Sequence, residues 1–451
     1  MKITADFTKI TGKIKPMHGV GQPPYSTPLS SPHMHYLGDA RIPYARLHDV
    51  GGAYGGSRYV DIPNIFPDFD ADENDPASYD FSFTDDLIAK IVEQGCGIIY
   101  RLGVTIENSF RTKAYRIYPP KDMHKWARIC EHVVRHYNEG WADGFHYGIK
   151  YWEIWNEPDG SMHFGKCSMW LGTPQEFYSL YEITANHLKK CFGDSIKVGG
   201  YASYGFTRST WKELNEDGTI KDANPEVLGE LVPIFFRDFL LHISSEEHKA
   251  PLEFFSWHSY WDVKTIEKTE DYVSMMLHKY GFSDVETHLN EWNPGPDRAR
   301  RGTMYAAAQI WAIMSMMQKR KQVGVMNFYD ARMGASVYGG LFNPETCLPY
   351  PAYYAFMAFG DAYALGSEVE TTSDDEDVYV LGASDGRHSV LLLSNVSTED
   401  REIELNLVGV DMQDAYVLLL DEAHRYSPAG AQAIRNGKLL LHGNSCAEIR
   451  F

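Results

Sequence analysis

Eight short apolar runs recur along the first three quarters of this 451-residue chain, and each ends in polar side chains. Stretches with helical periodicity lie between most of them, among them 83–95, 123–140, 173–193 and 301–321. Thr84 is the predicted N-cap of the first stretch, and Gly193 is the predicted end of the third. Short strands that alternate with helices indicate a parallel sheet, and eight such units suffice to close a barrel. The sequence therefore predicts an α/β fold, a (β/α)8 barrel, over residues 14–360. The predicted strands are 15–21, 44–50, 97–103, 151–158, 196–203, 254–260, 286–292 and 324–330.

The remainder of the chain has a different pattern. Residues 361–451 contain short β-rich runs separated by turn residues, without a long helical stretch. Such spacing is typical of an antiparallel β-sandwich. Residues 1–13 also alternate between apolar and polar side chains. We expect them to add a strand to this small C-terminal accessory domain.

Composition excludes several kinds of partner. A formal net charge of −19 argues against nucleic acid and anionic membrane surfaces. The six cysteines form no Cys-x-x-Cys pair, so neither a disulfide framework nor a zinc site is expected. The N-terminus lacks the apolar core of a secretion signal, and no apolar run has transmembrane length. These features predict a cytoplasmic protein, although a trimmed signal would leave the same pattern. A homo-oligomer is compatible with this composition.

Two carboxylates stand at predicted strand ends, where barrel enzymes place their reacting groups. Each follows an asparagine, in Asn156-Glu157 and in Asn290-Glu291. We expect Asn290, as the neighbour of Glu291, to favour the ionised form of that glutamate. They fall on the fourth and seventh predicted strands, which lie on opposite sides of a small barrel. Two carboxylates that face each other across a cleft are the equipment of glycoside hydrolysis. The alternative for Glu157 is an unremarkable glutamate that reaches solvent at the mouth of a loop.

Several motifs resemble glycoside hydrolase family 39, the β-xylosidase and α-L-iduronidase family, over roughly residues 14–360. They are RLHD (46–49), SYDFSFTDDLIAKIVEQG (78–95), WNEP (155–158), WHSY (257–260) and NEW (290–292). WNEP alone is moderately specific, whereas WNEP, WHSY and NEW in this order and spacing form a strong signature. The resemblance implies a retaining enzyme that takes a small oligosaccharide or glycoside and needs no metal or other cofactor.

The resemblance also implies roles for single residues. Glu157 matches the general acid/base and Glu291 the nucleophile. Asn156 matches the amide that binds the sugar 2-hydroxyl. Tyr260 matches the tyrosine that hydrogen-bonds the nucleophile, and His258 matches the histidine two positions before it. The apolar residues that precede Glu157 favour its protonated form at neutral pH.

Further residues are expected to bind the substrate. His48 matches a substrate-binding histidine on the second strand of the family barrel. The strand ends and the flanks of the two glutamates add these candidates: Arg46, Trp292, Tyr329, Asp330 and Arg332. At least one of the tryptophans 152, 155 and 292 is expected to be a sugar platform. The glycine-rich stretch GGAYGGS (51–57) is expected to form a flexible wall of the sugar pocket, because it lacks the lysine of a phosphate loop.

The chain departs from the family beyond its eighth strand. Family xylosidases hold the far hydroxyls of the sugar there with an acidic pair, whereas this chain has DARMGASVYGGLFNPE (330–345). We therefore expect that a simple β-xyloside is not the best substrate. Asp330 and Arg332 are the candidates for binding the distal hydroxyls of the sugar or a substituent on it.

The leading hypothesis is an exo-acting retaining glycosidase that removes a terminal sugar, similar to a xyloside or arabinoside, from short oligosaccharides. One alternative is a catalytically inactive carbohydrate-binding barrel. Another is a metal-dependent barrel hydrolase that uses His18, His48 and Asp49. Hydrolysis of aryl glycosides separates the first alternative from the leading hypothesis, and sensitivity to chelators separates the second.

Overall fold

The computed structural model of the protein describes most of the chain. The described residues are 1–26, 30–50, 60–105, 117–160, 167–295, 298–334, 336, 338–430 and 433–451. The glycine-rich stretch 51–57, predicted to wall the sugar pocket, lies outside them.

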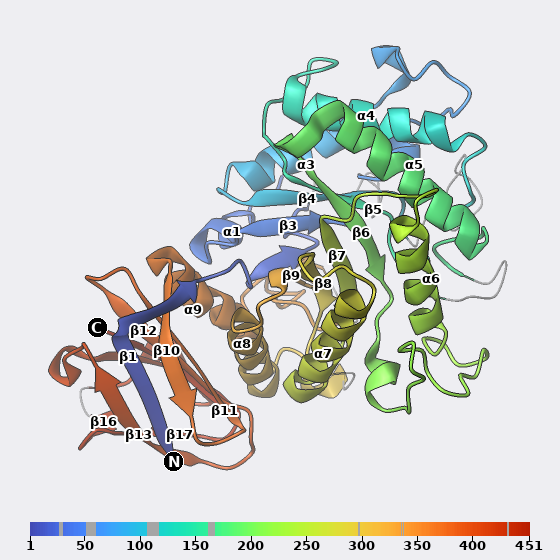
Figure 1. Ribbon diagram of the computed structural model, residues 1–451. Coiled ribbons are helices and arrows are strands. Elements are labelled where there is room, and N and C mark those ends of the chain that lie inside the picture. Colours follow the sequence, from blue (N-terminus) through green and yellow to red (C-terminus); the bar gives the residue numbers. More distant parts are fainter. Residues whose placement is uncertain are drawn as a thin grey trace.

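The eight predicted strands form a closed barrel and follow one another around it in chain order. All neighbouring strands are parallel, and the last strand pairs with the first. Each strand overlaps the run predicted for it, although β2, β3 and β5 are three or four residues shorter than that run, so the prediction of a (β/α)8 barrel is confirmed (Figure 1). The strands are β2 (Gly19–Gly21), β3 (Tyr44–Leu47), β4 (Gly97–Leu102), β5 (Tyr151–Ile154), β6 (Lys197–Ser203), β7 (Phe254–Ser259), β8 (Glu286–Trp292) and β9 (Val323–Phe328).

Helices cover the outside of the barrel. The α-helices of the described residues are α1 (His35–Asp39), α2 (Ile62–Ile65), α3 (Ser82–Val92), α4 (Met123–Glu139), α5 (Pro174–Phe192), α6 (Val232–Ser244), α7 (Val263–Lys279), α8 (Met304–Gln318) and α9 (Pro351–Leu365). None of them has both the length and the apolar character that a membrane crossing requires.

Local sequence signals explain where most of these helices begin and end. Helix α5 starts with a capping box, in which Thr173 accepts from the Glu176 N–H and the Glu176 side chain accepts from the Thr173 N–H. Gly193 ends it with a φ of 53°. The prediction of Thr84 as an N-cap was wrong. Helix α3 begins two residues earlier, at Ser82, and Thr84 is buried inside it.

A ten-stranded sheet forms the second part of the molecule. Its neighbouring strands are antiparallel except for β1 and β13, which are parallel. The N-terminal strand β1 (Lys2–Lys13) lies between β10 and β13 (Figure 1). This agrees with the predicted mostly antiparallel C-terminal fold. The other strands are β10 (Ser367–Ser373), β11 (Val378–Ser384), β12 (Ser389–Asn395), β13 (Arg401–Val408), β14 (Tyr416–Leu420), β15 (Arg425–Pro428), β16 (Ile434–Arg435), β17 (Lys438–Leu441) and β18 (Ser445–Arg450).

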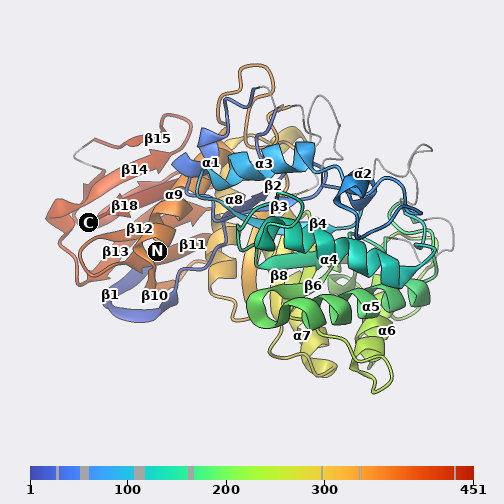
Figure 2. The same ribbon diagram turned by 90° about the horizontal axis from the view of Figure 1, so that it is seen from above.

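The central strands of this sheet are buried on both faces. In β12, Leu391 and Leu393 belong to the core inside the folded sheet, whereas Val390 and Leu392 belong to the larger core of the barrel and its helices. Successive side chains of a strand point to opposite faces, so this alternation requires apolar cover on both sides. Helices α8 and α9 supply the cover on the barrel side (Figure 2).

Helix α8 is apolar around its whole circumference because it lies between the barrel and the sheet. It contacts β11, β12 and β18 on one side and its neighbours α7 and α9 on others. The hydroxyl of Ser394 in β12 donates to the carbonyl oxygen of Ala308 at 2.7 Å. A helix that is buried on all sides needs no polar stripe.

Candidate active site

The two glutamates predicted from the sequence lie together at the carboxyl ends of the barrel strands. Glu157 follows β5, the fourth strand of the barrel, and Glu291 lies near the end of β8, the seventh. One oxygen of each carboxylate and a nitrogen of His258 lie within 4.8 Å of one another. Such a close approach of single oxygens agrees with the roughly 5–5.5 Å that separates the carboxyl groups of a retaining glycosidase.

The apolar residues before Glu157 anchor its backbone. Trp152 and Trp155 are fully buried, and the indole N–H of Trp155 donates to the carbonyl oxygen of Met169 at 2.9 Å. The backbone N–H of Glu157 donates to the carbonyl oxygen of Ala202 at 2.9 Å, and its φ of 47° is unusual for a residue other than glycine. Residues held in such conformations cluster at functional sites.

The expectation of a sugar platform among the tryptophans 152, 155 and 292 was wrong. All three are fully buried. The Trp292 ring meets Phe328 edge-on, with ring centroids 5.3 Å apart, and Phe328 in turn packs against Phe356 of α9. Trp292 therefore belongs to the core outside the barrel, and it is corrected from a substrate-binding candidate to a structural residue.

Glu291 sits among donors that favour its ionised form. One oxygen accepts from the Arg46 guanidinium at 2.7 Å, and the other accepts from the Tyr260 hydroxyl at 2.6 Å. Burial acts to raise the pKa of Glu291, but the charges of His258 and Arg46 outweigh it, and its pKa lies below the ordinary value. A carboxylate that stays ionised can act as a nucleophile.

Arg46 orients three side chains of the site from its buried side. Its three guanidinium nitrogens hydrogen-bond Glu153, Glu291 and Asn156, each at 2.7 Å, and its side chain is fully buried. Arg46 is therefore corrected from a substrate-binding candidate to a positioning residue. Because the Asn156 oxygen accepts from Arg46, the donor end of that amide is oriented away from Arg46. The Asn290 amide donates to Glu153, so the expectation that Asn290 supports Glu291 was wrong.

His258 connects the two glutamates. Its Nδ1 lies 2.7 Å from an oxygen of Glu157 and 3.6 Å from an oxygen of Glu291. Burial alone would lower the pKa of His258, but the charges of Glu291 and Glu157 raise it above the ordinary value. The imidazole and Glu157 can therefore share one proton.

His48 has the opposite character. Burial, together with the charges of Arg101 and Arg46, holds the pKa of His48 well below its ordinary value. The ring is therefore neutral. Arg101 Nε can only donate, so Nδ1 of His48 accepts its hydrogen bond at 3.1 Å, and the ring proton must reside on Nε2. That nitrogen lies 3.7 Å from Glu291 and 3.3 Å from Asp49.

Polar side chains from the first, second and eighth barrel strands form a connected wall beside Glu291. The Tyr329 hydroxyl donates to Asp49 at 3.0 Å and accepts from Gln22. Asp330 is fully buried and accepts from Arg332 at 3.1 Å and from Ser336 at 2.8 Å. Asp330 and Arg332 were both predicted to contact the distal hydroxyls of the sugar. Arg332 is the more accessible of the two, with 32% of its side chain exposed.

Several residues of the site were missed in the sequence. Glu153 is a buried charge inside an apolar strand, and that pattern was the signal that could have identified it. Asp159 is also buried, and it accepts from the Ser203 hydroxyl and from the Tyr204 N–H. No local pattern identifies Gln22, because its role depends on the neighbouring strand.

The residues of the metal-dependent alternative do not come together. His18 is fully buried, and its ring packs against Phe359 and Tyr363 of α9, outside the barrel. Its Nε2 contacts the carbonyl oxygen of Arg41 at 2.9 Å. His18 therefore cannot share a ligand with His48 and Asp49, which lie at the barrel mouth.

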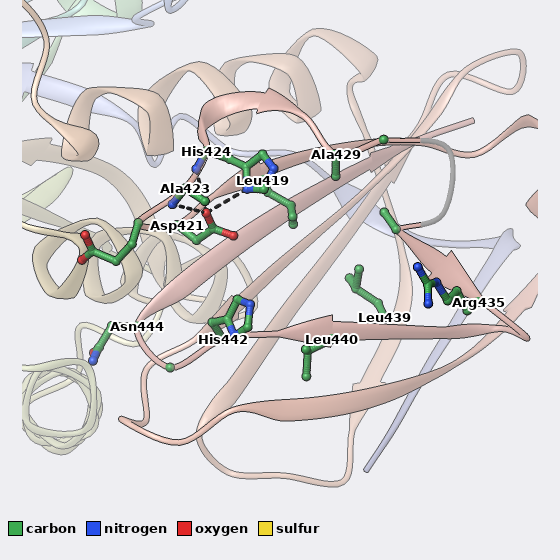
Figure 3. A pocket seen from close by; sticks show the side chains of 14 residues that line it. Leu419, Asp421, Ala423, His424, Ala429, Arg435, Leu439, Leu440, His442 and Asn444 are labelled. Atoms are coloured by element: carbon green, nitrogen blue, oxygen red, sulfur yellow. Dashed lines mark hydrogen bonds and ion pairs between the residues drawn. The ribbon is translucent and has the colours of Figure 1, made fainter.

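A separate cavity of about 620 Å³ opens in the ten-stranded sheet, away from the two glutamates. Asp421 lines it, but its carboxylate accepts from the backbone N–H groups of Ala423 and His424 (Figure 3). The remaining wall mixes leucine and alanine side chains with polar ones, among them His442 and Asn444. Among the described residues that line the cavity, no two carboxylates face each other, so we do not assign the hydrolytic site to it.

Comparison with known proteins agrees with this geometry. A model of the glycosyl hydrolases family 39 matches residues 64–332, more than half of the chain. A β-xylosidase from Geobacillus stearothermophilus is 25% identical over 370 residues, which cover 75% of this chain and 67% of that protein. Another from Caldicellulosiruptor saccharolyticus is 23% identical over 94% of this chain and 85% of that protein.

Solved structures share the fold. A glucosidase from Croceicoccus marinus has a TM-score of 0.75 and 21% sequence identity, with coverage of 100% of this chain and 98% of that one. The family match includes the strands that carry Glu157 and Glu291. The chain belongs to glycosyl hydrolase family 39 and is a glycoside hydrolase.

Proposed function

We propose that the protein is an exo-acting, retaining glycosidase that removes a terminal sugar, similar to a xyloside or arabinoside, from short oligosaccharides. Glu157 is its general acid/base and Glu291 its nucleophile. The observation that carries the proposal is the close approach of these two carboxylates, one held ionised and the other joined to a histidine.

In the first step, an oxygen of Glu291 attacks the anomeric carbon while Glu157 gives a proton to the leaving oxygen. The bond from the sugar to the leaving group breaks, and a glycosyl ester on Glu291 forms. In the second step, Glu157 takes a proton from water, which attacks the same carbon and releases Glu291. Two inversions leave the configuration of the product unchanged.

The surrounding residues have separate tasks in this proposal. Asn156, oriented by Arg46, donates to the sugar 2-hydroxyl. His48 presents its Nε2 proton near Glu291 and binds a neighbouring hydroxyl. His258 holds Glu157 in place and exchanges a proton with it, so that Glu157 can act first as an acid and then as a base.

The wall of Gln22, Asp49 and Tyr329 supports the exo mode. Its hydrogen bonds tie the first, second and eighth barrel strands together beside the nucleophile, and in this proposal the wall closes the site behind the terminal sugar. The two similar proteins named β-xylosidase support a pentose, whereas the absence of an adjacent acidic pair after β9 supports a difference in how the far hydroxyls are held.

A panel of aryl glycosides tests the substrate class. The panel contains β-xyloside, α-L-arabinoside, β-glucoside, β-galactoside and iduronide. We expect hydrolysis of at least one, with simple β-xyloside not the fastest. If the best substrate carries a carboxylate, Arg332 should lie close to it, and Arg332→Gln should raise KM for that substrate. A β-xyloside that is much the fastest would contradict the prediction on specificity.

Proton NMR of the fresh product tests the stereochemistry. We expect the anomer with the substrate's configuration to appear first, before mutarotation. Initial appearance of the opposite anomer would contradict the retaining assignment of Glu157 and Glu291. Release of single sugars from a reduced oligosaccharide, without internal fragments, tests the exo mode in the same samples.

A further inference from the structure

The mouth of the barrel carries a strip of exposed aromatic rings on one side of the catalytic pair. This strip, called the aromatic strip below, consists of Tyr204, Trp211 and Trp261. Tyr204 is 36% exposed and Trp211 is 48% exposed, whereas Trp261 is partly exposed. Trp211 and Tyr204 belong to the long connection between β6 and α6, and Trp261 follows β7. Large aromatic side chains are usually buried, so a group of them at a catalytic mouth calls for an explanation.

The aromatic strip adjoins the catalytic pair at both ends. A Cβ on Gly160 would lie 3.8 Å from the Tyr204 ring and 3.5 Å from the backbone oxygen of Glu157, so this ring lies close to the proposed acid/base. At the other end, Trp261 follows Tyr260, whose hydroxyl donates to Glu291 at 2.6 Å. The rings therefore lie near the catalytic pair, after the two strands that stand between those of Glu157 and Glu291.

The strip is held in place by the backbone and by packing. The buried carboxylate of Asp159, two residues after Glu157, accepts from the Tyr204 N–H at 2.9 Å and from the Ser203 hydroxyl. The rings of Trp211 and Trp261 meet edge-on, with centroids 4.6 Å apart. These contacts preorganise the strip, so a ligand gains contact area without first ordering the rings.

A positive charge accompanies the rings. The Arg208 guanidinium lies 5.8 Å from the centre of the Trp211 ring. Gly229, with a φ of 88°, lies between Tyr204 and Arg208, and a Cβ there would be 3.6 Å from the former and 3.7 Å from the latter. Arg208 thus lies close to both Tyr204 and Trp211, and its guanidinium can donate hydrogen bonds to hydroxyl groups.

The two sides of the mouth differ in character. Buried polar groups, among them Gln22, Asp49 and Tyr329, lie beside the nucleophile on the first, second and eighth barrel strands. The exposed rings follow the fifth and sixth strands, between the strands of the two glutamates, and Tyr204 lies beside the acid/base. A glycosidase protonates the leaving oxygen, so the leaving group departs on the side of its acid.

We propose that the aromatic strip binds the leaving group, and that this group is a sugar ring whose apolar C–H face stacks on Trp211 while Arg208 contacts its hydroxyls. The inference rests on the proposed function and adds a leaving-group subsite to it. Aromatic rings provide large contact areas for such ligands, and the neighbouring donor fixes their orientation. The chain would then favour short oligosaccharides over glycosides with small leaving groups.

The test compares two substrates that share one terminal sugar, chosen as the best in the aryl panel. One is a disaccharide and the other is the glycosyl fluoride, whose leaving group is a single atom and cannot reach the strip. Trp211→Ala should lower kcat/KM for the disaccharide by about tenfold, equivalent to about 1.4 kcal/mol of lost contact, and change the value for the fluoride less than about twofold. Trp211→Phe should retain most of the disaccharide activity.

Tyr416→Ala is the matched control, because Tyr416 is also 48% exposed but lies in the ten-stranded sheet. This substitution should leave kcat/KM unchanged for both the disaccharide and the fluoride. Equal losses for disaccharide and fluoride in Trp211→Ala would contradict the proposal, as would no loss for either.

A binding measurement separates this inference from the proposed function. In the Glu291→Gln background, the disaccharide should change tryptophan fluorescence, and the change should weaken when Trp211→Phe is added. A wild-type enzyme that hydrolyses neither substrate would contradict the proposed function, and the fluorescence titration would still test the strip. An unchanged titration in the double variant would contradict the proposal that the aromatic strip binds the leaving group.

Discussion

At the scale of single residues, the site depends on one buried cation that serves three partners. Arg46 lies between Glu153 and Glu291 and also fixes Asn156. The two carboxylates would each be costly to bury without it. The ionised state of the nucleophile and the stability of the barrel floor therefore depend on the same side chain.

Arg46→Met should affect both properties. The free energy of unfolding should fall by about 3–5 kcal/mol, the usual cost of removing one partner of a buried ion pair. Arg46 lowers the pKa of Glu291, so its removal should raise that pKa. The acidic limb of the kcat/KM profile should consequently move to higher pH. Denaturant unfolding and the pH profile measure the two effects.

Arg41→Met is the control for this substitution, because Arg41 pairs with Asp361 at the surface, with 51% of its side chain exposed. It should change stability by about 1 kcal/mol or less. If Arg46→Met unfolds the protein, Arg46→Lys provides the pH profile. An acidic limb that stays in place in a folded Arg46 variant would contradict the role assigned to this residue.

Residue types and order predicted the catalytic pair and its nearest neighbours, but not the direction of every side chain. Glu157 and Glu291 follow recognisable motifs, and Tyr260 and His258 contact them as the resemblance implied. Trp292 was assigned wrongly, because the face of a barrel strand that points inward depends on closure and on irregular pairing. The register between β7 and β8 shifts just before Glu291.

At the scale of elements, strands were easier to predict than helix ends. Short apolar runs with polar ends identified all eight barrel strands, although several strands are shorter than the predicted runs by three or four residues. The start of α3 was placed wrongly, because Phe81, which has no side-chain cap, precedes it. Caps such as Thr173 follow a known pattern, whereas a helix start without one leaves no comparable signal.

The capping box of α5 gives a prediction at this scale. Thr173→Ala should lower the free energy of unfolding by about 1 kcal/mol, because the Glu176 N–H loses its acceptor. Thr173→Ser retains the hydroxyl and should remain close to wild type. Thermal or denaturant unfolding measures the difference. A Thr173→Ala protein as stable as Thr173→Ser would show that the cap contributes nothing measurable to α5.

At the scale of the whole molecule, the two ends of the chain build one sheet. Strand β1 pairs with β10 and β13, so the first residues complete a domain that otherwise consists of the last ninety or so. Ile3 is fully buried in this sheet, whereas Ile10 on the same strand is 56% exposed. The pattern of residues 1–13 favoured a strand here, but the neighbours of that strand could not be predicted from local sequence.

This pair of isoleucines tests the contribution of β1 with a matched control. Ile3→Ala should cost about 2–5 kcal/mol of stability, as expected for a large-to-small change in a core. Ile10→Ala should stay within about 0.5 kcal/mol of wild type. Chemical denaturation followed by circular dichroism measures both. Similar losses in the two variants would contradict the packing of β1 in the sheet.

The central claim is the division of labour between Glu291 and Glu157. Glu291→Ala should lower kcat by at least about 10⁴-fold with every substrate, because no glycosyl ester can form. Glu157→Ala should be milder for aryl glycosides, whose leaving groups depart with little protonation. In that variant the second step lacks its base, so a small anion that needs no base should restore turnover.

Azide rescue followed by NMR of the products tests this claim most directly. For Glu157→Ala, we predict that azide accelerates turnover and yields a glycosyl azide of unchanged anomeric configuration. For Glu291→Ala, azide should give the inverted azide or no product. If the two azide outcomes were exchanged between the variants, the roles of Glu157 and Glu291 would be reversed. Full activity in both variants would contradict the assignment of this pair as the catalytic residues.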